Sequence, residues 1–324
     1  MASGGPERVR FTVDAADAGK RLDQVLATNV PGLSRRKARV LLDIGGVYVD
    51  KERIKKADRL VRAGQQIEAV LGGALHRAEG AGTAARVKEA AKLPEYRVVH
   101  EDAHLLVVEK PAGLLTAPTP ESDRNNLADL LARRPLTLSE RSESKGSKRD
   151  PAVKGSARSK SSPIFVVHRI DLDTSGLLVF AKTDDANRAL SELFRTHDIE
   201  REYLAVVEGR FPDVPSVDRP IDGKRAVTHF SVERRLALAT VIRARLETGR
   251  THQIRIHARA LGHPVLGDIQ HGRAIPEGLR APPRMALHAA KLGFTHPATK
   301  AVMLFESALP SELASWVDSL APSS

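Results

Sequence analysis

The sequence predicts an α+β fold: a large domain built on a largely antiparallel, mixed sheet, preceded by a small α/β domain at the N-terminus. In the large domain, segments of strand composition outnumber helical ones, and strand pairs outnumber strand–helix–strand units. A length of 324 residues favours two domains. A hydrophobic fraction of 41% is enough for a sizeable core and excludes a chain that is disordered throughout.

Changes in composition divide the chain. We predict a small domain over residues 8–72, a linker rich in alanine and glycine over 73–95, a large domain over 96–310, and a helix with a tail over 311–324. Residues 135–163, within the predicted large domain, are basic and rich in serine and include few bulky apolar side chains. Because this stretch cannot bury enough surface to offset its ordering entropy, we predict a disordered basic insertion over 135–163.

The small domain combines short strands with two helices. Apolar residues at helical spacing predict the first helix over residues 20–29. Ser34 is a good N-cap for the second helix, which Gly45 ends. Strands are predicted over residues 10–13, 47–49 and 66–71.

The second helix opens with four cations, Arg35, Arg36, Lys37 and Arg39. Positive charge at a helix N-terminus is unfavourable unless an anion lies nearby. We therefore assign these four side chains to RNA binding. A solvated basic face is the alternative.

In the large domain, each element follows from local apolar patterning and capping. Two strands with a tight turn between them are predicted over residues 97–108, a short helix over 125–134, and a buried strand over 164–167. Thr183 caps a helix with acidic residues in its first turn. The remaining predicted elements are strands over 177–181, 203–208, 226–233, 241–246 and 303–306, a strand-to-helix junction over 245–262, and a last helix from Ser311.

Charge and composition exclude several classes of function. The 51 Lys and Arg against 40 Asp and Glu give a net charge of +11, which favours a polyanionic partner. The absence of cysteine excludes disulfide scaffolds, thiolate metal sites and cysteine catalysis. No apolar stretch approaches the ~18 residues of a membrane helix, and the N-terminus lacks the apolar core of a signal peptide. We expect a cytoplasmic protein without membrane contact.

The densest polar cluster is HRIDLDTSG, residues 168–176, between two apolar strands. Two carboxylates, an arginine and a histidine there would be unfavourable if they were buried without a task. One interpretation is a loop that caps the sheet, with Asp173 in an Asx turn and Gly176 at positive φ. Asp171 fits that interpretation less well, because an arginine stands two residues before it and a second arginine-rich turn occurs later in the chain.

That second element is TGRTHQIRIH, residues 248–257, where Arg250, His252, Arg255 and His257 surround a strand-to-helix junction. If it meets the Asp171 loop, an arginine–carboxylate pair forms that keeps the acid ionised and oriented. Nucleophilic or proton-transfer chemistry needs such a carboxylate. A purely structural ion pair is the alternative.

Two other chemistries fit the sequence less well. Six of the twelve histidines fall between His252 and His296, but their spacing matches no local metal motif, so we expect no metal. Asp171 and Asp173 resemble the paired aspartates of phosphatases, yet His168 and Arg169 separate them from the preceding strand.

Taken in order, KPAG, HRIDLDTSG, REYLAVV, TGRTHQIRIH, GHPVLGD and LHA are similar to the motifs of RluA-type pseudouridine synthases. The resemblance runs over residues 98–309 and implies the pseudouridine synthase fold. Residues 9–71, with RLDQVL and LSRRKARVLLDIGGVYVD, resemble the RNA-binding domain named after the fourth protein of the small ribosomal subunit. The departures from the family pattern are Ile170 for a common leucine, Arg201 for lysine and His271 for tyrosine.

The resemblance implies a role for each matching residue. Asp171 is the catalytic aspartate, Arg255 its ion-pair partner in preference to Arg250, and Tyr203 lies against the flipped uracil. Arg169 helps to displace the target base. Substrate binding is assigned to Arg169, His168, Thr174, Lys110, Arg250, His252 and Leu287.

The implied reaction is the isomerisation of uridine in RNA to pseudouridine, which needs no cofactor. The expected partner is ribosomal RNA, with transfer RNA as the alternative, and the protein is expected to act as a monomer. An RNA chaperone that keeps the fold without the catalysis is the competing hypothesis.

Overall fold

The computed structural model describes residues 6–75, 94–123, 125–134, 163–214 and 216–320. Most of the predicted linker, almost all of the predicted basic insertion and the end of the C-terminal tail lie outside the described residues. The chain forms two compact units. The first joins Met1–Leu93 to Ala117–Asn126, and the second joins Pro94–Thr116 to Leu127–Ser324.

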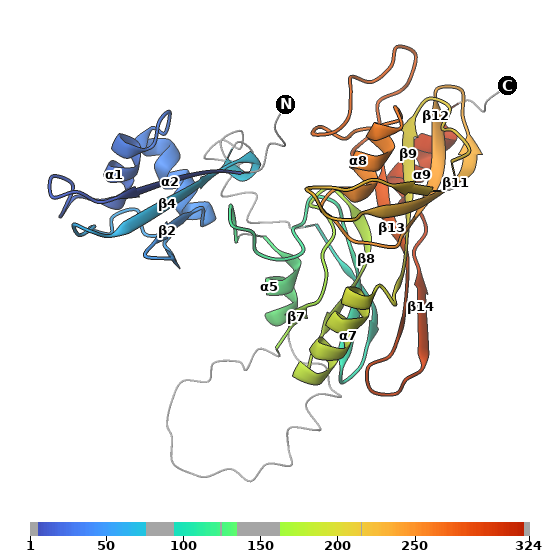
Figure 1. The fold of residues 1–324 in the computed structure, drawn as a ribbon, viewed down its shortest axis with the longest axis horizontal. Helices are drawn as coiled ribbons and strands as arrows, with labels where there is room; N and C mark the ends of the chain where they lie inside the picture. Colours follow the sequence, from blue (N-terminus) through green and yellow to red (C-terminus); the bar gives the residue numbers. More distant parts are fainter. Residues whose placement is uncertain (1–5, 76–93, 124, 135–162, 215, 321–324) are drawn as a thin grey trace, which may run out of the picture. The chain divides into compact units, whose positions relative to one another are not determined.

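The first unit is a four-stranded sheet with two helices. Its strand order is β1-β4-β2-β3, and the helices α1 and α2 lie beside each other and share one core with the sheet (Figure 1). The Ser34 side chain accepts the Lys37 N–H, and Gly45 ends α2 in the left-handed region at φ +85°, so both predicted caps are confirmed. The elements are β1 (Glu7–Thr12), α1 (Leu22–Asn29), α2 (Arg35–Ile44), β2 (Val47–Val49), β3 (Glu52–Arg53) and β4 (Gln66–Leu71).

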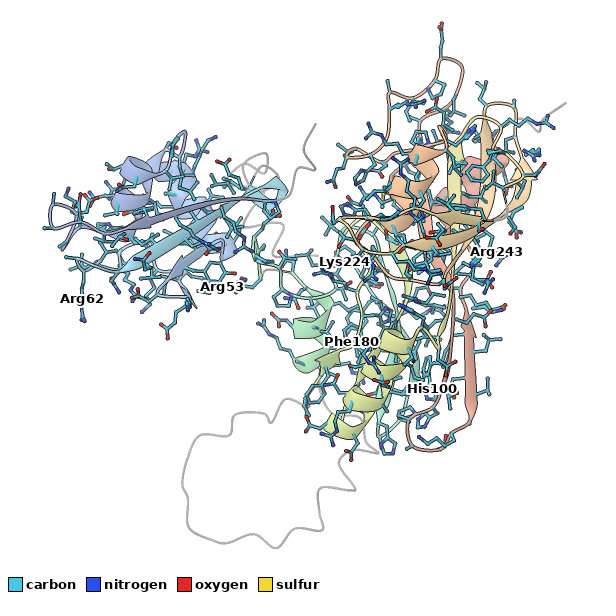
Figure 2. All side chains as sticks on the ribbon, in the orientation of Figure 1. Arg53, Arg62, His100, Phe180, Lys224 and Arg243 are labelled. Atoms are coloured by element: carbon cyan, nitrogen blue, oxygen red, sulfur yellow. The ribbon has the colours of Figure 1, made fainter. Side chains whose placement is uncertain are left out.

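The segment Ala117–Asn126 belongs to the first unit although it lies within the range predicted for the large domain. Arg53, labelled in Figure 2, donates to the Thr119 carbonyl at 2.6 Å. The Asp123 N–H donates to the Ile44 carbonyl at 3.1 Å, at the end of α2. These bonds join segments that lie far apart in the sequence. No local pattern predicts them, so the sequence did not assign residues 117–126 to the first unit.

The second unit contains one long sheet in the order β10-β11-β12-β9-β13-β8-β6-β5, with β14 paired to β13 and β7 to β8. Its strand pairs are antiparallel apart from β13 with β8, so the predicted sheet type is confirmed. The strands are β5 (Arg97–Glu101), β6 (Leu105–Lys110), β7 (Phe165–Val166), β8 (Ser175–Ala181), β9 (Glu200–Glu208), β10 (Ser216–Asp218), β11 (Val227–Arg235), β12 (Ala239–Leu246), β13 (Leu287–Thr295) and β14 (Val302–Glu306).

Helices cover both faces of this sheet. On one face α5 (Leu127–Ala132) packs on β6 and β8, where Figure 2 labels the buried Phe180, and α8 (Gln253–Ala260) packs on β9 and β12. The opposite face carries α7 (Asp184–Thr196) and α9 (Ser311–Asp318). Tyr203 on β9 contacts the core under α5 and the core under α8, which places these two helices on the same face.

Two strand predictions need correction. The buried strand predicted over 164–167 is only the two-residue β7, and Val166 is 39% exposed, because β7 pairs with the last two residues of β8 and with no second partner. Strand β13, which lies between β9 and β8, was not predicted, since His288, Lys291 and Gly293 interrupt its apolar pattern. Gly176 allows the close pairing with β13, because a Cβ there would lie 2.2 Å from the Ala289 carbonyl oxygen.

Candidate active site

The loop that carries Asp171 connects β7 to β8, and the segment after β6 holds it in place. The Thr116 hydroxyl donates to the Ile170 carbonyl at 2.9 Å, and the Gly113 N–H donates to the Leu172 carbonyl at 2.8 Å. Both neighbours of Asp171 are therefore fixed through their backbones. This leaves the Asp171 side chain, 27% exposed, free to project from an anchored loop.

Lys110 supplies the buried anchor of this loop. Its side chain is completely buried, and its ammonium group donates to three backbone carbonyls, those of Pro111 at 2.9 Å, Leu114 at 2.7 Å and Leu172 at 3.1 Å. Burial lowers the pKa of Lys110 to about 7. Because every donor is used by the backbone, we revise the predicted substrate-binding role of Lys110 to positioning of the Asp171 loop.

Arg255, on α8, joins two carboxylates. Its Nη1 donates to Asp171 Oδ2 at 2.9 Å, while Nε and Nη2 donate to the two oxygens of Asp268 at 2.6 and 2.7 Å. The predicted contact between Asp171 and Arg255, which lie 84 residues apart, is confirmed. The bidentate pair with Asp268 fixes the plane of the guanidinium and so the direction from which it approaches Asp171.

Asp268 has a structural function that the sequence did not predict. Its side chain is 1% exposed, and its Oδ1 also accepts the backbone N–H groups of Gln270 and His271, each at 2.9 Å. Burial alone would raise the pKa of Asp268, but the hydrogen bonds from Arg255 and these backbone groups lower it overall. The available signal was the guanidinium itself, whose five donors a single carboxylate cannot occupy.

His252 lies on the other side of Asp171. It adopts the left-handed region at φ +56° as the residue before α8, a conformation that is uncommon for a residue other than glycine. Its Nε2 lies 3.9 Å from Asp171 Oδ2, and its Nδ1 lies 2.9 Å from Nε2 of His271. Burial lowers the pKa of both histidines. The sequence assigned His252 to substrate binding without placing it beside Asp171, and that role stays a prediction.

Tyr203 lies on β9 beneath this group. Its ring packs against the core that contains Ile170 and against the core that contains Leu287. Burial, with a contribution from the charge of Asp171, raises the pKa of Tyr203 to about 12, so the phenol stays neutral at physiological pH. Within the described part of the chain, no side chain or backbone group forms a hydrogen bond with the Tyr203 hydroxyl.

Two arginines of the predicted set differ in their surroundings. Arg169 is exposed and forms no ion pair or hydrogen bond with any described residue. Arg250 instead donates through Nε to the Arg225 carbonyl at 2.9 Å, at the start of β11. Arg255 rather than Arg250 is thus the ion-pair partner of Asp171.

Three further members of the predicted substrate-binding set have side chains that pack within the protein. His168 stacks on Phe194 with ring centroids 4.3 Å apart, and its Nε2 accepts the Val179 N–H at 3.0 Å. Burial, assisted by Arg201, lowers the pKa of His168 to about 3, so it stays neutral. Thr174 is 1% exposed and Leu287 is 3% exposed within the core. The Thr174 hydroxyl is buried and has no hydrogen-bond partner among the described residues. The substrate-binding roles of these three residues stay predictions.

In the first unit, an internal anion partly neutralises the four-cation helix start. The buried carboxylate of Asp23 accepts from Arg35 at 3.1 Å and from Arg39 at 2.7 Å, and also from Arg21. Burial would raise the pKa of Asp23, but these hydrogen bonds lower it well below its usual range. The Arg36 side chain is exposed and forms no ion pair or hydrogen bond with any other described residue.

Comparisons with known proteins agree with the motifs and the fold. Residues 104–260 match the family model of the RNA pseudouridylate synthases, and residues 20–67 match that of the S4 domain. Ribosomal large subunit pseudouridine synthase D of Nitrosomonas europaea is 32% identical over 331 residues, covering 96% of this chain and 88% of the relative. The chain belongs to the RNA pseudouridine synthase family.

Other members of the pseudouridine synthase family match over similar lengths. Ribosomal large subunit pseudouridine synthase C of Escherichia coli K12 is 32% identical, covering 93% of each chain. The solved structure of human RNA Pseudouridylate Synthase Domain Containing 4 shares the fold, with a TM-score of 0.52 and 23% identity over 70% of this chain and 95% of the human one. As a pseudouridine synthase the protein is an isomerase of RNA, and the predicted family, fold and N-terminal RNA-binding domain are confirmed.

Over the described ranges, no three His, Asp or Glu side chains are grouped in a way that could hold a metal ion. None of the described helices is both long enough and apolar enough to cross a bilayer.

Proposed function

We propose that this enzyme isomerises specific uridines of large-subunit ribosomal RNA, with Asp171 as the catalytic group. The observation that carries the proposal is the contrast within the Arg255 cluster. Asp171 accepts one guanidinium hydrogen bond at 2.9 Å and keeps 27% of its side chain exposed, whereas Asp268 is saturated and buried. An ionised, oriented carboxylate with an unoccupied oxygen can attack a sugar carbon or accept a proton.

In the reaction, the bond between uracil N1 and C1′ breaks, the uracil rotates, and C5 bonds to C1′. The proton on C5 is then released to solvent and N1 gains a proton, so the product is an isomer of uridine. Asp171 assists the departure of uracil by attack on C1′, by removal of the 2′ proton or by attack on C6. Arg255 holds the carboxylate in one orientation, and Asp268 holds Arg255. The neutral phenol of Tyr203 offers an aromatic face for the base.

A uridine inside a helix cannot reach Asp171, so the base must leave its stack at a cost of about a few kcal/mol. The exposed, unpaired guanidinium of Arg169, two residues from Asp171, is able to stack in the space that the base leaves. Contacts to the RNA backbone would come from cations of the S4 domain, among them Arg36, whose exposed side chain has no described protein partner.

Ribosomal RNA is favoured as substrate because the relatives that match over nearly the whole chain are named for the large ribosomal subunit. Transfer RNA that reacts in place of ribosomal RNA would contradict this assignment of the substrate.

The test measures tritium release from large-subunit ribosomal RNA labelled at C5 of uridine. We expect release by the unaltered enzyme and a loss on the order of 10⁴-fold or more with Asp171→Asn, as for removal of a catalytic group. Asp173→Asn is the matched control, because it removes an exposed carboxylate from the same loop, and its activity should stay within about twofold. Substantial release by Asp171→Asn would overturn the assignment.

A further inference from the structure

The loop between α8 and β13 presents an isoleucine entirely to solvent. Ile269 is 100% exposed, the largest value among the exposed large apolar residues of the described chain, followed by Val302 at 85%. Single apolar residues on a surface are common, so exposure alone implies no function. Two further observations distinguish Ile269 from an ordinary exposed apolar residue: it directly follows Asp268, and its loop is held by hydrogen bonds.

The turn that carries Ile269 is held by hydrogen bonds on both sides of it. Asp268 Oδ1 accepts the N–H groups of Gln270 and His271, and the Asp268 carbonyl accepts the Gly272 N–H at 2.8 Å. Asp268 is itself fixed by the bidentate pair with Arg255. Because the backbone is already ordered, little conformational entropy remains to be lost when Ile269 contacts a ligand.

The same turn forms part of the boundary of the active site. Its first residue, Asp268, reaches Asp171 through Arg255, and its fourth, His271, reaches Asp171 through His252. Ile269 therefore projects from a turn that is connected at two points to the proposed catalytic carboxylate. In Figure 1 the orange chain after α8 runs out in loops that project beyond the sheet of the second unit.

We propose that Ile269 is an apolar wedge that packs against the RNA base left exposed when the target uridine leaves its stack. Once one base is flipped out, its neighbour presents an apolar face to water. A β-branched alkyl group covers that face without requiring a hydrogen bond, and apolar side chains are used in this way by proteins that unstack nucleic acids. Arg169 approaches from the Asp171 loop and Ile269 from the Asp268 turn. The inference rests on the proposed function, because it needs a flipped base at Asp171.

The experiment compares two RNA substrates of the same sequence, a stem–loop fragment of large-subunit ribosomal RNA with the target uridine stacked in it and a short unpaired oligonucleotide. We expect Ile269→Ser to lower kcat/KM about tenfold on the stem–loop, about the penalty for one uncovered base step, and less than twofold on the oligonucleotide. Ile269→Leu should restore the stem–loop activity. Val302→Ser is the matched control, since it removes an exposed alkyl group from β14, and it should leave both substrates unaffected.

Fluorescence of 2-aminopurine beside the target uridine provides a second readout that needs no turnover. Binding of Asp171→Asn should raise the fluorescence as the stack opens, and adding Ile269→Ser to it should remove most of that rise. Equal losses on both RNAs, or an unchanged fluorescence rise, would overturn the wedge. Failure of the proposed catalysis would instead appear as activity of Asp171→Asn, with the fluorescence comparison still valid.

Discussion

The long sheet of the second unit carries a polar cluster beside β13 on each of its two faces. The two clusters differ in how many of their hydrogen-bond donors and acceptors have partners within the protein. Leu287 and Ala289 point into the cores on the Tyr203 face, so His288 between them points to the opposite face. There His288 Nδ1 lies 2.8 Å from Ser175 Oγ, and its Nε2 lies 3.1 Å from Ser307 Oγ.

Chemistry sets the direction of every bond in this second cluster. The Glu109 carboxylate can only accept, so the single hydrogen of the Ser307 hydroxyl goes to Glu109 at 2.8 Å, and Ser307 Oγ accepts from His288 Nε2. Nε2 therefore carries the ring hydrogen, and Nδ1 accepts from the Ser175 hydroxyl, whose oxygen in turn accepts from Arg284 at 2.9 Å. Burial lowers the pKa of His288 to about 4, which keeps the ring neutral, as this chain of bonds requires.

The difference separates a structural cluster from a reactive one. On the His288 face the serine and histidine are buried, and each has its donors and acceptors used within the protein. On the Asp171 face, one carboxylate oxygen has no donor among the described residues, and Arg169 has no described partner. We call the face that carries Asp171 the open face and the face that carries His288 the closed face. Substitutions on the open face should change turnover, and substitutions on the closed face should change stability.

Asp268→Asn should show the largest effect of the substitutions that leave Asp171 intact. It breaks the bidentate pair that orients Arg255, so kcat should fall about 100-fold, the effect of a misplacement of about 1 Å. The free energy of unfolding should also fall by about 3 kcal/mol, since the buried Arg255 guanidinium loses one of its two charge partners and keeps only Asp171. Kinetics and denaturant titration measure the two effects. An unchanged kcat would show that the orientation of Arg255 does not matter.

Lys110→Met should have the next largest effect. Methionine preserves the approximate volume but removes three hydrogen bonds to backbone carbonyls. The Pro111 and Leu114 carbonyls then lack a described donor, while the Leu172 carbonyl keeps the Gly113 N–H, and the free energy of unfolding should fall by about 2–3 kcal/mol. Because the Leu172 carbonyl is one of the three, the Asp171 loop loosens, and we expect kcat to fall about tenfold with KM little changed. A stability loss without any fall in kcat would limit Lys110 to a role in folding.

These two residues show how far the sequence alone could lead. The caps of helix α2 could be predicted because capping is local. The residues alone indicated a pair between Asp171 and an arginine of the 248–257 turn, and the family resemblance selected Arg255. Asp268 could not be given its role, because only the fold determines which of several acids meets the remaining donors of Arg255. Lys110 was assigned to substrate for a similar reason, since its three acceptors are backbone atoms that a sequence does not display.

The predictions about the fold that were wrong also missed contacts between distant parts of the sequence. Strand β13 carries a histidine that an apolar pattern excludes, yet that histidine is satisfied by two serines from β8 and from the segment after β14. The cations Arg35 and Arg39 were expected to need an external anion, and packing of α1 against α2 supplies Asp23 instead. In each case a tertiary contact decides what the local pattern leaves open.

His288→Gln tests the closed face. We expect kcat to change less than about twofold, while the free energy of unfolding at pH 7 falls by about 2 kcal/mol as the bonds to Ser175 and Ser307 are disturbed. A tenfold loss of kcat with normal stability would contradict the contrast between the two faces.

The pH dependence of stability sharpens the same test. The folded pKa of His288 is about 4 and the unfolded value about 6.5, so the unfolded chain binds more protons between these values. Stability should fall as the pH drops from 6.5 to 4, with about 3 kcal/mol contributed by His288. The His288→Gln variant should lose that part of the dependence and keep the part from His168, which urea titrations at several pH values would measure.

The smallest effect is expected in the S4 domain. There, helix α2 carries Arg35 and Arg39, which bind Asp23, and also Arg36, which has no described partner. Arg36 is exposed and unpaired within the described chain, so Arg36→Gln should leave stability unchanged and reduce the slope of log affinity for RNA against log salt by about 0.7–0.9. Arg39→Gln is the matched variant, because it also removes a donor from the buried Asp23 and should lower the free energy of unfolding by about 1–2 kcal/mol. If Arg36→Gln leaves the salt slope unchanged, that side chain contacts no phosphate, and RNA binding by the S4 domain must use other cations.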